Sequence, residues 1–256
     1  MSRAPALRLI QKIGVGIDAI DLGAASARGI AVCNMPGTNS QAVAELTLGL
    51  MLSVLRQIPT LDHRLRREGR WGLPEGAQGL FGEISGKVVG LVGYGEVARR
   101  LEPVLDALGA REILLHTRGA VSPAIARVVS KPEILEASDI LSMHLPETNE
   151  TRNWLDAVAI ATMKPGAVVV NTSRGTVIDE TALINALRTG RLAGAGLDVY
   201  AREPLPPEAE ILSTQNVVTL PHIAWLTRET LERSLLAATD NISRLVSGSS
   251  LRNRCA

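Results

Sequence analysis

The stretch that decides the fold is Val88-Val89-Gly90-Leu91-Val92-Gly93-Tyr94-Gly95-Glu96-Val97-Ala98. Its first five residues form an apolar run typical of a buried strand, and we expect a helix over residues 97–107 beyond the turn. Gly93 would make the tight turn, and Gly95 would let a pyrophosphate approach the backbone N–H groups at the start of the helix. Ala98 stands at the third glycine position, a replacement that the dinucleotide-binding fingerprint allows. An ordinary strand-to-helix turn is the alternative, and the strand–turn–helix context favours the nucleotide site.

Short β-branched runs alternate with helical stretches along the rest of the chain, which is typical of a parallel sheet covered by helices. Further strands are expected over residues 112–115, 139–143, 167–171, 195–199 and 217–220. A helix is expected from Glu180 to Thr189, with Asp179 as its N-cap and Gly190 just past its end. Near the start, two strands over residues 8–14 and 30–33 flank a helix over residues 22–27. The pattern predicts an α/β fold.

The composition narrows the class of protein. The chain has 256 residues, of which 46% are apolar, so it can bury one or two cores of ordinary size. A net charge of +1 gives no general attraction for nucleic acid or an anionic membrane. Cys33 and Cys255 fit no metal spacing and no disulfide framework, so we expect no metal and a cytoplasmic location. The N-terminus lacks the features of a signal peptide, and residues 42–55 fall well short of the ~20 apolar residues of a membrane span.

Residues Gln41 to Arg67 are predicted to form one long helix, apolar nearly all round over its first half and basic over its second. A helix that is apolar on all faces must be buried on all faces. One interpretation is the core helix of a single domain. The other is a helix that joins two domains and packs against a second subunit, which would make the protein a homodimer. Residues Arg64 to Arg70 would then be a solvated or subunit-facing arm.

The end of the second predicted strand bears on the choice of coenzyme. An NAD-binding fold carries Asp or Glu about 20 residues past the glycines, where it binds the ribose 2′-hydroxyl. This chain has His116-Thr117-Arg118 there. Arg118 can hold a 2′-phosphate through a charge-assisted pair, and no carboxylate at this point repels one. The alternative is a solvent-facing basic loop. We therefore predict that NADP(H) is preferred and that NAD(H) remains possible.

Three polar residues in the last third of the chain supply the elements of a reaction: Arg174, Glu203 and His222. Each follows a predicted strand, so all three can face one cleft at the carboxyl edge of the sheet, where ligands bind in open α/β folds. An imidazole can donate a proton near neutral pH, and a neighbouring carboxylate stabilises the protonated ring. A guanidinium can bind a carboxylate and polarise the neighbouring carbonyl. Singly each fits a structural role; together they favour a site that binds an α-keto acid and protonates its carbonyl.

From Leu7 to Asn241 the chain resembles the D-isomer-specific 2-hydroxyacid dehydrogenase family. Besides the glycine turn, the resemblance rests on Gly14-Val15-Gly16-Ile17-Asp18, Val43-Ala44-Glu45-Leu46, His144-Leu145-Pro146, Asn171-Thr172-Ser173-Arg174-Gly175, Gly196-Leu197-Asp198-Val199, Glu203-Pro204 and Pro221-His222-Ile223-Ala224. It implies a Rossmann doubly wound parallel sheet over residues 43–224 that binds the dinucleotide. It also implies a second, smaller, flavodoxin-like substrate-binding domain from residues 1–42 and 225–256, including a helix after Trp225.

The family's roles carry over onto matching residues. The resemblance implies that His222 is the acid/base, that Glu203 is its partner, and that Arg174 binds the substrate's carboxylate and keto oxygen. It implies a substrate-binding set of Val15, Gly16, Arg174, His222 and Trp225, in which the backbone N–H groups of Val15 and Gly16 receive the carboxylate. The implied coenzyme contacts are Gly93, Gly95, Glu96, Val97, His116, Thr117, Arg118, Leu145, Pro146, Thr172, Ser173, Arg174 and Asp198. His144 is then a coenzyme-side residue and not a second acid.

Within the family, Trp225 and the Thr117-Arg118 pair look most like glyoxylate and hydroxypyruvate reductases, which are similar to glycerate dehydrogenases. Glu203 argues against formate dehydrogenases, which carry glutamine there. The expected reaction is reduction of hydroxypyruvate or glyoxylate by hydride from the nicotinamide, with His222 supplying the proton.

The chain departs from the family at its start. Family members begin with additional strand–helix units of roughly 50 residues, or about two such units. We therefore expect an N-terminally truncated chain whose substrate domain is incomplete and leaves a sheet edge and apolar surface uncovered. The chain is then a fragment, the product of a misassigned start, or a degenerate copy. The alternative function is a catalytically impaired, NAD(P)-binding scaffold or corepressor-like protein.

Overall fold

The computed structural model describes residues 4–73 and 81–256. It divides into two compact units, one formed by Met1–Ala42 with Trp225–Ala256 and the other by Val43–Ala224. The larger unit holds the glycine turn and the three polar residues of the predicted reaction.

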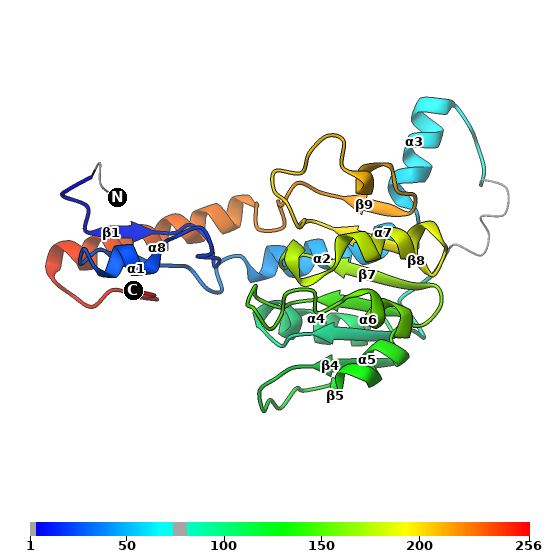
Figure 1. Cartoon of the computed structure of the whole chain (residues 1–256), viewed down its shortest axis with the longest axis horizontal. Helices are drawn as coiled ribbons and strands as arrows, with labels where there is room; N and C mark the ends of the chain where they lie inside the picture. Colours follow the sequence, from blue (N-terminus) through cyan, green and yellow to red (C-terminus); the bar gives the residue numbers. More distant parts are fainter. Residues whose placement is uncertain (1–3, 74–80) are drawn as a thin grey trace. The chain divides into compact units, whose positions relative to one another are not determined.

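The larger unit is built on a seven-stranded sheet in the order β5-β4-β3-β6-β7-β8-β9, and every neighbouring pair is parallel (Figure 1). Its strands are β3 (Val88–Val92), β4 (Glu112–His116), β5 (Arg127–Val128), β6 (Ile140–Met143), β7 (Ala167–Asn171), β8 (Leu192–Leu197) and β9 (Val217–Thr219). The chain first adds strands on one side of β3 and then returns to its other side. This reversal is the topological switch point of a doubly wound sheet, and the predicted fold class is confirmed.

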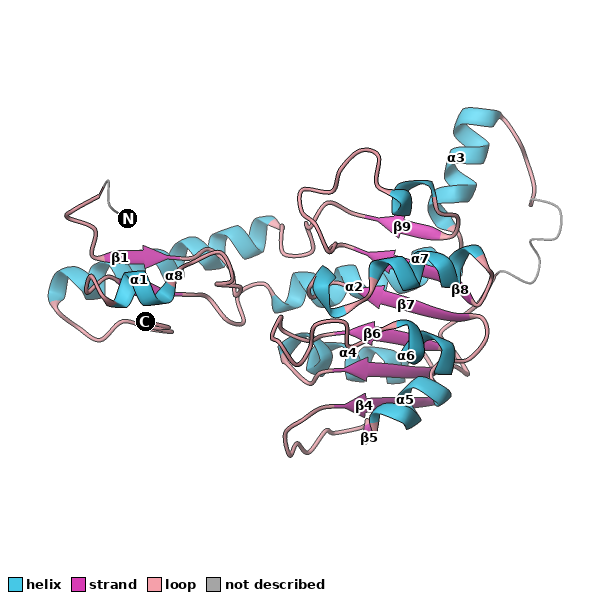
Figure 2. Cartoon of the chain, viewed as in Figure 1, coloured by secondary structure: helices cyan, strands magenta, loops and turns pink. Residues whose placement is uncertain are grey.

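Helices cover both faces of this sheet (Figure 2). One face packs against α2 (Ser40–Leu55) and α4 (Glu96–Ala107), and the other against α5 (Lys131–Ala137), α6 (Ala157–Thr162) and α7 (Glu180–Arg188). Alternate residues of β3 pack on opposite faces of the sheet, because successive side chains of a strand point to opposite sides. Val88 and Val92 join the core on one side, while Val89 and Leu91 join that on the other.

Several boundaries differ from the sequence-based prediction. β3 and β7 are confirmed as predicted, and Asp179 caps α7 by accepting a hydrogen bond from the Ala182 N–H at 3.0 Å. β8 begins at Leu192 and ends at Leu197, not 195–199. Its first half contains Gly194, which lacks a side chain to mark a strand. Beyond Leu197 the Asp198 carboxylate accepts hydrogen bonds from the loop after His222. Helices α5 and α6 were not predicted.

The prediction of one helix from Gln41 to Arg67 is wrong. Two helices, α2 and α3 (Ile58–Glu68), meet at a break with a bend of 63°. Pro59 explains the break, because its ring would clash with the carbonyl four residues earlier, that of Leu55, the last residue of α2. Gln57 takes a left-handed φ of 52° at the break. The freed Leu55 carbonyl instead accepts a hydrogen bond from the Gly82 N–H at 2.9 Å.

Helix α2 is a core helix of the larger unit over most of its length. Leu50, Met51 and Val54 are buried with residues of the sheet. Leu50 and Val54 pack against Gly196 and Gly194 of β8, where a Cβ would lie 3.0 and 2.7 Å from them. These glycines let the helix approach the sheet closely. By contrast, α3 has no buried residue. Among the described residues no single helix is long and apolar enough to cross a membrane; only the bent pair α2 and α3 passes that test together.

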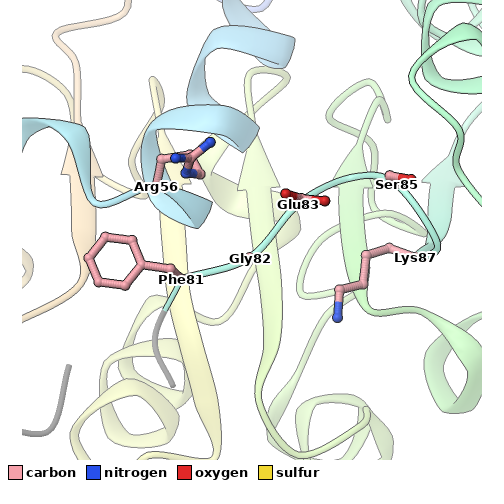
Figure 3. A pocket seen from close by; sticks show the side chains of 6 residues that line it. All are labelled: Arg56, Phe81, Gly82, Glu83, Ser85 and Lys87. Carbon is pink, nitrogen blue, oxygen red and sulfur yellow. The ribbon is translucent and has the colours of Figure 1, made fainter. Parts of the chain in front are cut away.

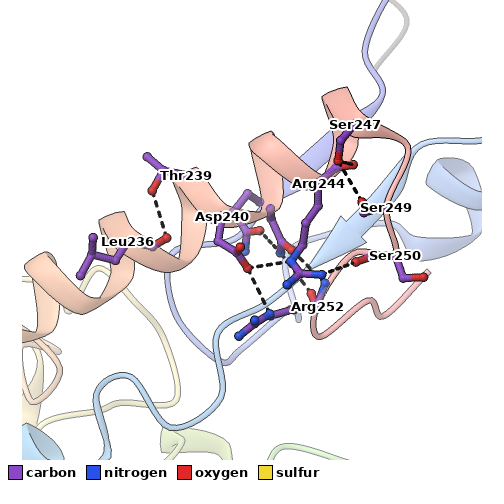
Figure 4. A network of polar contacts seen from close by, with 10 residues as sticks. Leu236, Thr239, Asp240, Arg244, Ser247, Ser249, Ser250 and Arg252 are labelled. Atoms are coloured by element: carbon purple, nitrogen blue, oxygen red, sulfur yellow. Dashed lines mark hydrogen bonds and ion pairs between the residues drawn. The ribbon is translucent and has the colours of Figure 1, made fainter.

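The smaller unit contains two parallel strands, β1 (Leu9–Gln11) and β2 (Ala31–Cys33), joined through α1 (Leu22–Ser26). Ala25, Ile30 and Val32 form its buried cluster. The chain returns to this unit through α8 (Arg228–Ser247), whose C-terminal half anchors the segment after it (Figure 4). There the Asp240 Oδ2 accepts a hydrogen bond from the Arg244 Nε at 2.8 Å and forms an ion pair with the Arg252 Nε at 3.1 Å. Helix α8 also exposes large apolar side chains: Leu235, Leu236 and Val246.

Candidate active site

The predicted coenzyme and catalytic residues of the larger unit gather at the carboxyl edge of its sheet. Because the strands are parallel, the loops that leave β3, β4, β6, β7, β8 and β9 emerge at the same edge. These loops carry, in turn, the glycine turn, Arg118, Leu145, Arg174, Asp198 with Glu203, and His222. The sheet topology thus brings together residues that lie up to 129 positions apart, as Gly93 and His222 do.

Glu203 and His222 form the closest polar contact at this edge. The Glu203 Oε2 lies 2.6 Å from the His222 Nδ1. The other oxygen, Oε1, accepts a hydrogen bond from the Tyr200 N–H at 3.0 Å, which holds the carboxylate toward the ring. The two side chains are 34% and 41% exposed, so the imidazole is partly open to solvent. With Nδ1 engaged by the carboxylate, Nε2 is the ring nitrogen that remains for exchanging a proton with a substrate.

A cavity of about 620 Å³ borders this pair inside the larger unit. The side chain of Tyr200 is buried beside it, and its hydroxyl donates to the Leu220 carbonyl at 2.9 Å. This bond joins the segment after β8 to the end of β9. Burial raises the pKa of Tyr200 to about 12, so the hydroxyl stays protonated and keeps donating.

Asp198 holds the backbone beyond His222. It is fully buried, and its two oxygens accept hydrogen bonds from the N–H groups of Ile223 at 2.9 Å and Ala224 at 2.7 Å. Burial raises the pKa of this carboxyl, while the two N–H donors act in the opposite direction. The family resemblance implies a coenzyme contact for Asp198, which stays a prediction, and the structure shows that the residue shapes the His222 loop.

Arg174 leaves the sheet three residues after β7. The Asn171 side-chain amide donates to the Arg174 carbonyl at 2.8 Å, and the Ser173 N–H donates to the Asn171 Oδ1 at 3.0 Å, which fixes this turn. The Arg174 Nη1 donates to the Ser173 carbonyl at 2.7 Å. The next residue is Gly175, and only glycine fits at this position because a Cβ would overlap the carbonyl of Tyr200. The Arg174 loop and the Tyr200–Glu203 loop are therefore in close contact.

The glycine turn fits a dinucleotide phosphate. Gly93 has a φ of 98°, and a Cβ at this residue would lie 2.5 Å from the His144 carbonyl oxygen, so only glycine fits. Gly95 is the N-cap of α4, and no side chain caps the helix. The N–H groups of its first turn, at Glu96 and Val97, thus lack the side-chain acceptor that most helices carry and suit an anion.

His144 lies next to this turn and stays neutral. Its Nε2 is buried and has no hydrogen-bond partner among the described residues. Burial lowers its pKa to about 4. A ring that is uncharged at neutral pH is a poor proton donor, in keeping with the prediction that His144 is not a second acid.

Arg118 lies in the loop after β4, next to Thr117 and beyond His116, which ends that strand. Its guanidinium Nη1 lies 3.7 Å from the Glu150 Oε2, and both side chains are mostly exposed. The His116 Nδ1 lies 3.1 Å from the Val129 carbonyl oxygen. Arg118 is therefore a solvent-accessible cation near the end of β4, as the prediction of a 2′-phosphate contact requires.

The remaining predicted substrate residues, Val15, Gly16 and Trp225, belong to the smaller unit. Val15 and Gly16 follow β1 and Gly14, whose φ is 125°. The Asn34 side-chain amide donates to the Val15 carbonyl at 2.9 Å, which shapes this loop. Their part in substrate binding stays a prediction.

Two buried residues of the larger unit, Thr47 and Glu102, were not predicted from the sequence to have a role near the site. The Thr47 Oγ1 of α2 lies 2.8 Å from the Thr172 Oγ1, just after β7, and both residues are buried. Glu102 of α4 is also buried, beside Ala98, Leu101 and Leu105 of the same helix. A charged residue on the apolar face of a predicted helix was the signal that could have found it.

A second hollow lies at the opposite edge of the sheet, at the amino end of β3, among Arg56, Phe81, Gly82, Glu83, Ser85 and Lys87 (Figure 3). It measures about 440 Å³. Lys87 directly precedes β3, so this hollow is separated from the predicted site residues by the length of the strand.

Comparison with known proteins identifies the family to which the chain belongs. Residues 48–224 match the family model of the D-isomer specific 2-hydroxyacid dehydrogenase NAD binding domain. A glyoxylate reductase from Aeropyrum pernix is 38% identical over 97% of this chain and 76% of its own length. A D-3-phosphoglycerate dehydrogenase from Archaeoglobus fulgidus is 36% identical over 96% of this chain and 47% of its own. The chain therefore belongs to the D-isomer specific 2-hydroxyacid dehydrogenase family of NAD-dependent oxidoreductases.

A solved structure agrees with this assignment. An NADPH-dependent glyoxylate/hydroxypyruvate reductase from Sinorhizobium meliloti, in complex with NADP and malonate, superposes with a TM-score of 0.87 at 33% identity. The superposition covers 98% of this chain and 78% of that one.

Proposed function

We propose that this chain reduces hydroxypyruvate or glyoxylate to the corresponding 2-hydroxy acid, with NADPH as the preferred coenzyme. The 2.6 Å contact between the His222 Nδ1 and the Glu203 Oε2, at the carboxyl edge of a dinucleotide-binding sheet, carries the proposal. The names of the Aeropyrum pernix and Sinorhizobium meliloti relatives support the substrate class.

Each residue has a defined task in this reaction. The coenzyme, when bound, supplies a hydride to the keto carbon. His222 gives a proton to the keto oxygen through Nε2, so that one hydride and one proton convert the 2-keto acid to the 2-hydroxy acid. Glu203 stabilises the ring while it carries the proton. Arg174 binds the substrate carboxylate and polarises the carbonyl, since a guanidinium matches a carboxylate in charge and shape.

The preference for NADPH rests on the loop after β4. His116, Thr117 and Arg118 present no carboxylate, and Arg118 lies exposed where a 2′-phosphate is expected. A phosphate would compete with Glu150 for the guanidinium, and its greater charge favours it in that competition. The relative from Sinorhizobium meliloti is an NADPH-dependent reductase, which supports the proposed preference.

Initial rates measured with purified protein test the proposal. Glyoxylate, hydroxypyruvate and a panel of other 2-keto acids would each be assayed with NADPH and NADH by the loss of nicotinamide absorbance. We expect turnover of at least one of the two named acids and higher catalytic efficiency with NADPH. Absence of turnover in a protein that binds coenzyme would instead support the scaffold or corepressor-like alternative. A clear preference for NADH would contradict the coenzyme assignment alone.

We also propose a homodimer that uses α2 and α3. No residue of α3 is buried, and its apolar side chains Ile58 and Leu65 are about half exposed, at 51% and 49%. A partner's surface would cover them. Light scattering after size-exclusion chromatography measures the mass. We expect a dimer for the wild type and a shift toward monomer for Leu65→Glu; a wild-type monomer would contradict the assembly.

A further inference from the structure

A buried carboxylate outside the His222 site joins the glycine turn to the segment before β5. Glu102 of α4 is only 2% exposed. Its Oε2 accepts a hydrogen bond from the Tyr94 hydroxyl at 2.6 Å. Its Oε1 accepts hydrogen bonds from the N–H groups of Ile125 at 2.7 Å and Ala126 at 2.6 Å. Three donors from two separate segments therefore converge on one carboxylate.

The hydrogen bonds keep Glu102 ionised in spite of its burial. Burial by itself raises the pKa of the carboxyl, but the donors from Tyr94, Ala126 and Ile125 more than offset it and hold the pKa below the usual value. All three donors are neutral groups. The Arg99 guanidinium lies over the Tyr94 ring, 5.0 Å from its centroid, and places a positive charge beside the phenol.

The two segments that Glu102 joins both belong to the part of the fold where the coenzyme is expected to bind. Tyr94 is the residue between Gly93 and Gly95, whose backbone shape makes the phosphate site. Ile125 and Ala126 close the loop that begins after β4 and contains Arg118. In a dinucleotide-binding fold the adenosine half of the coenzyme lies between the glycine turn and the end of the second strand, which here is the start of the loop that Ile125 and Ala126 close. Glu102 thus ties the phosphate-binding turn to the closing end of the loop whose first residues are expected to receive the ribose.

Packing alone does not require a charge at this position. The other buried residues of α4 are apolar: Ala98, Leu101 and Leu105. Burying an ionised carboxylate costs free energy that an apolar residue would not cost. A buried charge with three directed hydrogen bonds instead specifies one geometry for the groups it holds.

We propose that Glu102 is a positioning residue for the coenzyme, which holds Tyr94 and the 125–126 backbone in the arrangement that receives the adenosine end. The inference rests on the proposed coenzyme role of the glycine turn and of Arg118. Without the carboxylate, the turn and the loop have more conformations, and part of the binding free energy is lost in ordering them. The nicotinamide end, which this contact does not touch, keeps its site.

Titrations with the coenzyme and its two halves test the inference. Dissociation constants would be measured for NADPH, for 2′,5′-ADP as the adenosine end, and for reduced nicotinamide mononucleotide as the other end. We expect Glu102→Ala and Glu102→Gln to raise the dissociation constants of NADPH and 2′,5′-ADP by about tenfold, and that of the mononucleotide less than about twofold. Tyr94→Phe, which removes one donor of three, should give a smaller rise of about threefold on the same two ligands.

Circular dichroism and thermal unfolding would establish that each variant is folded. Glu102→Gln and Tyr94→Phe keep nearly the native volumes, and they carry the test if Glu102→Ala does not fold. Unchanged affinity for 2′,5′-ADP in a folded Glu102 variant overturns the inference. An equal loss of mononucleotide affinity also overturns it, because that result means general loosening of the unit. A wild-type protein that binds neither NADPH nor 2′,5′-ADP contradicts the proposed function itself, and with it this inference, so the wild-type titration distinguishes the two failures.

Discussion

Asp198 fixes the backbone that follows His222, a residue whose own backbone conformation is unusual. The Asp198 carboxylate accepts hydrogen bonds from the two N–H groups that follow His222, at 2.9 and 2.7 Å. His222 itself has a φ of 55°, in the left-handed region that residues other than glycine seldom adopt. Glu203 then binds the ring at Nδ1. One carboxylate therefore sets the backbone of His222 and a second sets its imidazole.

Replacing Asp198 by Asn should impair catalysis and stability together. The amide keeps one acceptor oxygen but turns an NH₂ group toward a backbone donor, so one buried hydrogen bond is lost and two donors oppose each other. We expect the free energy of unfolding to fall by about 1–3 kcal/mol and kcat to fall about tenfold or more as His222 shifts. Urea unfolding and initial rates measure the two effects.

Asp156→Ala is the matched control for that change. Asp156 caps α6 by accepting a hydrogen bond from the Ala159 N–H at 2.8 Å. Its loss should cost about 1 kcal/mol of stability without altering kcat. An Asp198→Asn protein with the wild-type rate would show that Asp198 does not position His222.

Replacing His222 by Asn should separate function from stability. Asn tolerates the left-handed conformation better than His, so the free energy of unfolding should stay the same or rise by up to about 1 kcal/mol. The acid/base group is lost, and the rate should fall by at least about 100-fold. Activity assays and chemical denaturation of the same preparation check both. Retention of most of the activity would exclude His222 as the proton donor.

Replacing Arg118 by Ala should change coenzyme choice and little else. We expect the dissociation constant of NADPH to rise about 10- to 100-fold, and that of NADH to change little, because only NADPH carries the 2′-phosphate. The exposed 3.7 Å pair with Glu150 adds little to stability, so the unfolding midpoint should hardly move. Arg228→Ala, an 88% exposed arginine of the smaller unit, serves as the control. Equal effects on both coenzymes would contradict a 2′-phosphate contact.

The free energy of unfolding should fall in mild acid because the buried His144 ring is neutral in the folded protein. Its folded pKa of about 4 lies below the ordinary value of 6.5, so between these pH values the unfolded chain binds a proton that the folded chain does not. The stability contributed by the neutral ring is present above pH 6.5 and is lost as the pH falls toward 4, by up to about 3 kcal/mol. Unfolding free energies of wild type and His144→Gln would be compared from pH 7.5 to 4.5. We expect the wild type to lose stability more steeply; parallel curves would contradict the buried, neutral ring.

Gly175→Ala should disrupt the contact between the two catalytic loops. The added methyl group would overlap the carbonyl of Tyr200, whose N–H holds the Glu203 Oε1. We expect a loss of stability of about 1–3 kcal/mol and a larger fall in kcat than in coenzyme affinity. The matched control is Gly119→Ala, since a Cβ at Gly119 meets no atom within 4 Å. Equal behaviour of the two variants would show that the loops do not depend on this close approach.

The sequence predicted an element correctly where its local pattern was compatible with only one structure. The apolar run Val88–Val92 before Gly93 could only be a buried strand leading into a tight turn, and it is. The sequence-based prediction was wrong for Gln41 to Arg67, where one continuous helix was expected although Pro59 lies within the range. It also missed the first half of β8, where small residues accept the close packing of α2 and give no strand signal of their own.

The order of strands along the chain sufficed to place Arg174, Glu203 and His222 at one edge, because parallel strands all end on the same side. The sequence by itself thus determined the family, the sheet and the list of reactive groups. Only the tertiary structure decided which groups touch: Asp198 with the N–H groups after His222, and Glu102 with Tyr94 and the 125–126 backbone. The physical reason is that all but one of these contacts end on backbone N–H groups of loops, and every residue except proline offers such a donor, so no residue type in the sequence marks them. The exception is the Tyr94 hydroxyl, which meets Glu102 only because the glycine turn and α4 fold against each other.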